Sequence, residues 1–141
     1  MTAATFGVAG SLSINNEGMA MKQIMIVDDS PTDAHLLQKM LEKNGYQTLT
    51  AGNGNEGIEV ARLLRPDLIL MDVVMPGLNG FQATRELSSN PETSSIPVII
   101  VTRKDQKVDR VWGIRQGARD YITKPVSEGD LLSLINEALA S

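Results

Sequence analysis

The chain has 141 residues, enough for one domain, and its 42% hydrophobic and 21% charged residues are typical of a globular protein. A net charge of −4, from 13 Lys and Arg against 17 Asp and Glu, disfavours a broad nucleic-acid-binding surface. The absence of cysteine excludes a disulfide framework, a thiolate zinc site and thiol catalysis, and the single His excludes a histidine-rich metal cluster. No apolar run reaches the roughly 18 residues of a membrane span, so we expect no membrane insertion.

The first 21 residues differ in composition from the rest. They are rich in Ala, Gly, Ser, Thr and Asn, and they contain no Lys or Arg. They lack the basic start and the continuous apolar segment of a secretory signal. We therefore expect a flexible N-terminal extension over residues 1–21 and one folded domain over residues 22–141.

Short apolar runs then alternate with segments of helical spacing. The first run, Gln23–Val27, precedes a helix that has Ser30 as its cap, Pro31 as its first residue and Gly45 as its stop signal. We expect the other strands at residues 47–51, 68–71, 98–101 and 120–122, and the other helices at residues 54–64, 80–87, 105–116 and from a second capping box at 127 onward.

Five strand–helix pairs in this order predict an α/β fold with a parallel sheet and helices on both faces, because crossovers between parallel strands are right-handed. The strands are mostly apolar throughout rather than alternating, which agrees with burial of both faces of the sheet. In such sheets the ligand site lies beyond the carboxyl ends of the strands. The residues that end each strand are therefore the candidates for the site.

Polar side chains end four of the five predicted strands: Asp28 and Asp29 the first, Asp72 the third, Thr102 the fourth and Lys124 the fifth. Two like charges about 4 Å apart cost on the order of 4 kcal/mol at an effective dielectric of about 20, so converging carboxylates indicate a protonated acid or a bound cation. Oxygen ligands without His or Cys favour Mg²⁺ or Mn²⁺. Such a site suits phosphoryl transfer, in which Lys124 and Thr102 would contact phosphate oxygens.

Asp72 is the candidate nucleophile of this site. A carboxylate can attack phosphorus and form an acyl phosphate. Asp72 stands alone at the end of a central strand, whereas Asp28 and Asp29 are adjacent, an arrangement suited to holding a metal ion. We therefore expect phosphorylation at Asp72.

A resemblance to the CheY-like receiver domain of two-component response regulators is carried by the segments IMIVDDSP, DLILMDVVMPGLNG, IPVIIVT and GARDYITKP. It covers residues 22–141 and implies a flavodoxin-like, doubly wound, three-layer fold with strand order 2-1-3-4-5. It implies a Mg²⁺ ion held by Asp29, Asp72 and the backbone carbonyl of Val74, with Asp28 acting through water. It also implies that a histidine kinase phosphorylates Asp72 in the cytoplasm.

The same resemblance assigns the residues that respond to the phosphoryl group. Thr102 and Lys124 read the group, Tyr121 swings inward when Thr102 shifts, and the bond between Lys124 and Pro125 is cis. One departure is Arg103, directly after Thr102, where the family usually has a small residue. A long cation there would narrow access to the phosphoryl group or contact it.

The fourth predicted helix carries an apolar stripe that includes Val108, Val111 and Trp112. Helical spacing predicts that this stripe packs in the core. Because the family's output surface lies on the fourth helix and the fifth strand, the resemblance also makes Arg110, Trp112 and Tyr121 a candidate partner face.

A narrower resemblance is carried by VMPGLNGFQATREL and RQGARDYITKPV, which look most like stand-alone regulators of type IV pilus twitching motility. It implies a CheA-like hybrid kinase as the partner. We expect no output domain after the last helix, and hence a protein target, or a role as a phosphate sink or phosphorelay intermediate without direct output. We expect a monomer, or a weak dimer on phosphorylation.

Two other functions are compatible with a similar sheet. A metal-dependent phosphohydrolase with an aspartyl-phosphate intermediate typically has a second acid two residues after its nucleophile, and this chain has Val74 there. A flavodoxin-like FMN carrier needs a hydroxyl- and glycine-rich phosphate loop after the first strand, and this chain has the acidic DDSPTD. We therefore expect a signalling protein that catalyses only its own phosphotransfer and autodephosphorylation.

Overall fold

The computed structural model describes residues 20–140, so the extension expected over residues 1–21 lies almost wholly outside the described residues. Strands and helices alternate along this range: β1 Gln23–Val27, α1 Pro31–Lys43, β2 Gln47–Ala51, α2 Gly54–Leu64, β3 Leu68–Met71, α3 Gly80–Ser89, β4 Val98–Thr102, α4 Lys107–Arg115, β5 Asp120–Thr123 and α5 Glu128–Ala140. Each predicted element is present, and its bounds lie within two residues of those expected. Among the described residues, no helix has the length and apolarity needed to span a membrane.

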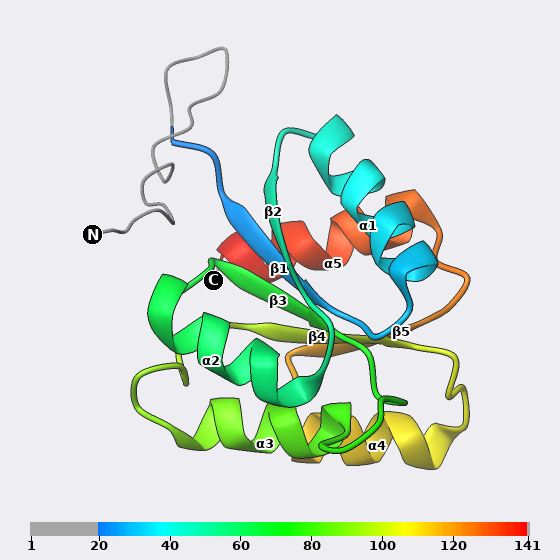
Figure 1. Cartoon of the computed structure of the whole chain (residues 1–141). Coiled ribbons are helices and arrows are strands. Elements are labelled where there is room, and N and C mark those ends of the chain that lie inside the picture. The colour runs from blue at the N-terminus through cyan, green and yellow to red at the C-terminus, as the bar shows by residue number, and fades with distance from the viewer. Residues whose placement is uncertain (1–19, 141) are drawn as a thin grey trace.

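The strands form one parallel sheet in the order β2-β1-β3-β4-β5. Helices α1 and α5 cover one face of this sheet, and α2, α3 and α4 cover the other (Figure 1). This arrangement confirms the doubly wound, three-layer fold with strand order 2-1-3-4-5. In the register, Val27 of β1 lies between Ala51 of β2 and Met71 of β3, so the central strands end at the same level.

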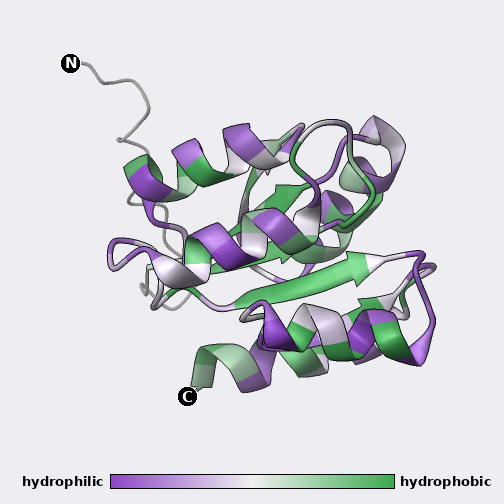
Figure 2. Ribbon diagram, turned by 90° about the horizontal axis from the view of Figure 1, so that it is seen from below, coloured by the Kyte–Doolittle hydropathy of each residue, from purple (hydrophilic) through white to green (hydrophobic). Residues whose placement is uncertain are grey.

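The core has a layer on each side of the sheet, because successive side chains of a strand point to opposite faces. Ile24 and Ile26 of β1 pack in the layer under α1 and α5. Met25 and Val27 pack in the layer under α2 and α3. Figure 2 shows the hydrophobic strands enclosed by helices whose outer surfaces are more hydrophilic. Burial on both faces explains why the three central strands β1, β3 and β4 are almost wholly apolar, whereas the edge strands β2 and β5 carry polar residues.

The start of α1 is fixed by its predicted cap. The Ser30 hydroxyl accepts a hydrogen bond from the backbone N–H of Asp33 at 3.2 Å, and Pro31 occupies the first turn. As a result, the Asp33 side chain projects from the first turn of α1, next to the edge of the sheet where β1 ends.

Helix α4 packs differently from the sequence-based expectation. The predicted core packing of its apolar stripe is wrong, because the exposed fractions are 66% for Val108, 46% for Val111 and 49% for Trp112. The helix approaches the sheet through Gly113, where an added Cβ would lie 2.8 Å from Ile100 Cδ1 and 3.0 Å from Tyr121 Cδ2. The missing side chain of Gly113 permits this close approach and turns the apolar stripe outward.

Candidate functional site

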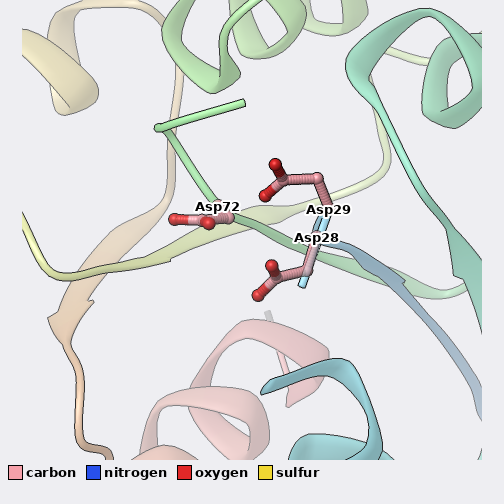
Figure 3. Close-up of side chains that lie close together, drawn as sticks. All are labelled: Asp28, Asp29 and Asp72. Carbon is pink, nitrogen blue, oxygen red and sulfur yellow. The ribbon is translucent and has the colours of Figure 1, made fainter. Parts of the chain in front are cut away.

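Three carboxylates meet at the carboxyl edge of the sheet. Asp28 and Asp29 follow β1, and Asp72 follows the neighbouring strand β3. One ligand oxygen from each of the three lies within 4.8 Å of the others. Figure 3 shows the three side chains close together at the ends of their strands. The topology therefore brings together acids that are 43 and 44 positions apart in the sequence.

Backbone hydrogen bonds orient the two buried acids. The exposed fraction is 5% for Asp28 and 8% for Asp72, whereas Asp29 is exposed. The N–H of Ser30 donates to Asp28 Oδ1 at 2.9 Å, and the N–H of Val73 donates to Asp72 Oδ1 at 2.8 Å. Burial raises the pKa of Asp72, and the nearby Lys124 opposes this shift. A cation at the site would therefore favour the ionised, nucleophilic form of Asp72.

Lys124 supplies a buried ammonium to the acids. Its Nζ lies 2.7 Å from Asp28 Oδ2, 2.9 Å from Asp33 Oδ2 and 3.5 Å from Asp72 Oδ2. Burial lowers the pKa of Lys124, but hydrogen bonds to Asp28 and Asp33 outweigh this effect and the pKa is raised. The peptide bond between Lys124 and Pro125 is cis. Lys124 therefore carries a charge that partly compensates the carboxylates.

Asp33 is a site residue that sequence reasoning missed. Its carboxylate accepts from Lys124 and also from Arg103, whose Nη1 lies 2.8 Å from Oδ2 and whose Nη2 lies 3.4 Å from Oδ1. Hydrogen bonds lower the pKa of Asp33 to about 2, with a larger contribution from Arg103 than from Lys124. In the sequence, Asp33 stands three residues after the Ser30 cap, where an acid is ordinary at a helix start, and a partner 70 positions away leaves no local signal.

Thr102 ends β4, next to the acids, and Tyr121 lies on the neighbouring strand β5. Thr102 is fully buried at the end of β4, and its hydroxyl lowers the pKa of Asp72. The Tyr121 hydroxyl donates to the carbonyl of Lys104 at 2.7 Å, and burial raises the pKa of Tyr121 to about 12. Tyr121 therefore holds the segment that follows Thr102, and its ring is turned inward.

The predicted partner-face residues have different environments. Arg110 donates to the carbonyl of Tyr121 at 2.8 Å and to Asp120 Oδ1 at 3.2 Å, so it ties α4 to β5. Trp112 is half exposed on α4, whereas only 4% of Tyr121 is exposed. In this conformation, Arg110 and Trp112 are accessible to a partner and Tyr121 is covered.

The loop after Asp72 folds tightly over this residue. Val74 has an exposed side chain in that loop. Gly80, which begins α3, lies against Asp72: an added Cβ would collide with the Asp72 carbonyl oxygen. The glycine therefore allows the loop to return beside the strand end.

The donor set fits a hard divalent cation. Asp28, Asp29 and Asp72 offer only carboxylate oxygens, and Asp29 faces solvent. Mg²⁺ prefers oxygen ligands, uses few carboxylates and keeps several waters. A site with two buried carboxylates and one exposed carboxylate leaves room for those waters. Asp28 accepts a backbone N–H on one oxygen and the Lys124 ammonium on the other.

Comparisons with known proteins agree with this geometry. The family described as "Response regulator receiver domain" matches residues 24–136. The protein PilH of Pseudomonas aeruginosa is 63% identical over 120 residues, which are 85% of this chain and 99% of PilH. Two solved structures are also similar. The chemotaxis protein CheY4 of Vibrio cholerae is 28% identical with a TM-score of 0.79, over 85% of this chain and 100% of that chain. The receiver domain of the sensor histidine kinase PA1611 of P. aeruginosa, which has a magnesium ion coordinated in its active site cleft, is 30% identical with a TM-score of 0.80, over 86% of this chain and 100% of that chain.

Proposed function

This chain belongs to the response regulator receiver domain family, and we propose that it is a stand-alone response regulator switched by phosphorylation of Asp72. The observation that carries this proposal is the environment of Asp72. Its carboxylate stands at the strand end among two further acids, with the Lys124 ammonium 3.5 Å away. This set can place a nucleophile, a divalent cation and a fixed positive charge around one phosphoryl group.

In the proposed reaction, an oxygen of Asp72 attacks the phosphorus of the donor, and the bond from phosphorus to the donor atom breaks. The electron pair of that bond leaves with the donor, and Asp72 becomes an acyl phosphate. Lys124 and the Thr102 hydroxyl would donate to phosphoryl oxygens. Mg²⁺ held by Asp29, Asp72 and the Val74 carbonyl, with Asp28 acting through water, would supply further charge neutralisation, and Mn²⁺ would suit the same donors.

The conformational response would pass from Thr102 to Tyr121. A Thr102 hydroxyl drawn toward the phosphoryl group would carry Lys104 with it, and the Lys104 carbonyl is the acceptor of the Tyr121 hydroxyl. Phosphorylation would thereby shift an equilibrium between two positions of Tyr121 that exists before the modification. The surface that changes would include α4, since Gly113 packs against the Tyr121 ring.

The proposed phosphodonor is a histidine kinase of the CheA-like hybrid type, and the proposed process is type IV pilus twitching motility. The 63% identity with PilH over nearly the whole of that protein supports this assignment. The cytoplasmic location that we propose follows from that phosphodonor. We also propose a monomer in the resting state and a weak dimer on phosphorylation.

The proposed output surface is the exposed side of α4, with Arg110 and Trp112. Residues 103–119 contain six Lys and Arg but only two Asp, a net charge of +4, so the rest of the chain carries −8. The half-exposed Trp112 lies within this basic region. An aromatic anchor among cations favours a partner that presents an acidic, partly apolar surface. Action as a phosphate sink or phosphorelay intermediate, without such a partner, is the alternative.

Intact-mass measurement after incubation with acetyl phosphate and Mg²⁺ tests the chemistry. We expect one added phosphoryl group, less of it without metal, and none in Asp72→Ala. The matched control is Asp130→Ala, which removes an exposed aspartate far along the chain on α5 and should gain the group normally. Repeated turnover of the donor without accumulation of phosphoprotein would instead favour the phosphohydrolase alternative.

Capture experiments with phosphorylated and unmodified protein then separate a protein target from a phosphate sink. A direct target is expected to bind one form preferentially, and Trp112→Ala is expected to weaken this binding. Equal recovery of partners with both forms, together with rapid phosphate loss from a sister regulator when this protein is added, would favour the sink.

A further inference from the structure

The Lys124 ammonium is held more closely by two other acids than by Asp72. Its contacts with Asp28 and Asp33 are 2.7 and 2.9 Å, within hydrogen-bond distance, whereas the contact with Asp72 is 3.5 Å. An ammonium has three N–H donors. Two of them are therefore committed to carboxylates that are not the phosphorylation site, and only one remains for a phosphoryl oxygen.

The two carboxylates that bind Lys124, those of Asp28 and Asp33, have different surroundings. Asp28 belongs to the acid cluster and is 2% exposed at its side chain, so a metal ion bound at that cluster would share its negative charge. Asp33 lies outside the cluster, on α1, and its second partner is Arg103. Arg103 is 68% exposed at its side chain and directly follows Thr102. The strength of the contact between Asp33 and Lys124 therefore depends on one exposed residue, Arg103.

We propose that Asp33 is a positioning residue that competes with the phosphoryl group for the Lys124 ammonium, and that Arg103 weakens this competition by sharing the negative charge of Asp33. This inference rests on the proposed function of Asp72. A carboxylate bound to two cations attracts each of them less strongly than a carboxylate bound to one. Arg103 would thus act on the phosphoryl group through Asp33 and Lys124, not by direct contact.

The geometry supports this indirect role. Both terminal nitrogens of Arg103 face the Asp33 carboxylate, at 2.8 and 3.4 Å, in the two-point arrangement that fixes a guanidinium plane. Arg103 and Lys124 share the same oxygen of Asp33, Oδ2, so the two cations compete for it directly. Arg103 also lines, with Asp33 and Lys124, a surface pocket between α1 and the segment after β5.

The direction of each effect follows from the transfer step. As the Asp72 oxygen bonds to phosphorus and the donor leaves, negative charge on the phosphoryl oxygens requires the third donor of Lys124. Asp33→Asn removes the competing charge, so Lys124 can approach those oxygens and phosphorylation should be faster. Arg103→Ala leaves Asp33 with Lys124 as its remaining cation, so phosphorylation should be slower.

A double-mutant cycle tests the proposal. The observed rate constant of phosphoryl gain from acetyl phosphate at saturating Mg²⁺ is measured by intact mass for wild type, Asp33→Asn, Arg103→Ala and the double variant. We expect each single change to alter the rate constant about fivefold, which corresponds to about 1 kcal/mol. In the Asp33→Asn background, Arg103→Ala should have no effect. Arg103→Lys should recover most of the wild-type rate.

The controls separate this network from stability and general charge. Asn at position 33 keeps the backbone N–H that the Ser30 cap uses, so α1 should retain its start. Arg62→Ala removes another partly exposed arginine, paired with Glu59 and Glu92, and should leave the rate unchanged. Thermal unfolding of each variant shows whether the fold is intact at the assay temperature.

A second measurement needs no phosphorylation. The hydrogen-exchange rate of the Lys124 ammonium, followed by ¹⁵N NMR, reports how tightly its carboxylate partners hold it. We expect faster exchange in Asp33→Asn and slower exchange in Arg103→Ala. If the ammonium responds in this way but Asp72 gains no phosphoryl group, the proposed function fails and the hold on Lys124 stands.

Two results would overturn the inference. An equal effect of Arg103→Ala in both backgrounds would mean that Arg103 acts on the phosphoryl group or its donor directly. An Asp33→Asn variant with the wild-type phosphorylation rate and unchanged ammonium exchange would mean that Asp33 does not restrain Lys124.

Discussion

Lys124 Nζ lies 2.7 Å from Asp28 Oδ2, and the two side chains are 6% and 2% exposed, although the residues are 96 positions apart in the sequence. The contact joins the end of β5 to the end of β1 across the intervening strands. The carboxyl edge of the sheet thus holds, among its acidic residues, a buried cation, Lys124. Its removal should affect the stability of the protein as well as its chemistry.

Lys124→Met is expected to lower the free energy of unfolding by about 3 kcal/mol at neutral pH, because it leaves buried carboxylates without their cation. Added Mg²⁺ should recover part of this loss, since the ion supplies the missing positive charge. Urea unfolding with and without Mg²⁺ measures both effects. The matched control is Lys43→Met, whose exposed pair with Glu128 should contribute less than about 1 kcal/mol. Equal losses in the two variants would contradict this prediction.

Asp33→Asn should change how stability depends on pH. The pKa of Asp33 is lowered to about 2 from an ordinary value of 3.8, so its pairing stabilises the folded state above the ordinary value. This contribution falls as the pH drops below about 4, and it is lost as the pH passes through the folded-state pKa of about 2. We expect the variant to be less stable by about 1 kcal/mol at pH 6, a value reduced by solvent screening at Arg103. The gap should narrow below about pH 4 and close only below pH 2, as followed by urea unfolding, and a gap independent of pH would contradict this explanation.

Gly80→Ala should distort the loop that follows Asp72. The new Cβ would collide with the backbone carbonyl of Asp72, which cannot move without shifting the strand end. We expect a loss of about 2 kcal/mol or more in unfolding free energy, and weaker Mg²⁺ binding by titration calorimetry. Gly129→Ala on α5 is the control, because its nearest neighbour, Ser127 Oγ, lies 4.0 Å from the added Cβ. A Gly80 variant with unchanged stability and unchanged metal affinity would refute the prediction.

Trp112→Ala is expected to change the unfolding free energy by less than about 1 kcal/mol, because half of the side chain is already exposed. A tryptophan packed in the core would cost about 3–5 kcal/mol when truncated. Leu131→Ala provides the comparison, since Leu131 is fully buried and should cost about 3 kcal/mol. Similar losses for the two variants would show that α4 packs more deeply than the structure indicates.

The fold could be predicted because its strongest signals are local. The run Gln23–Val27 is too apolar and too short for a surface helix, and the Ser30 and Pro31 pair marks a helix start on its own. The orientation of α4 could not be predicted in this way. Its apolar stripe has ordinary helical spacing, but a single glycine, Gly113, decides which side of the helix meets the sheet.

The acids of the candidate site could be found because they end their strands, and parallel strands bring those ends to one edge. Asp33 could not be found by this rule, because it lies within a helix. Its roles depend on the direction of the Arg103 and Lys124 side chains, which follow from packing at the end of β4 and β5. The sequence showed only that Arg103 stands where the family usually has a small residue, and it did not show that Asp33 is the partner of Arg103.

The backbone N–H of Lys124 donates to the carbonyl of Thr102 at 2.8 Å. The two residues whose hydroxyl and ammonium would contact the phosphoryl group are therefore joined by one backbone hydrogen bond of the sheet. For protein engineers this means that the two groups cannot be retuned independently. A substitution that moves the end of β4 also moves the Lys124 ammonium. Altered phosphorylation kinetics in such a variant would therefore combine the displacement of Thr102 with that of Lys124.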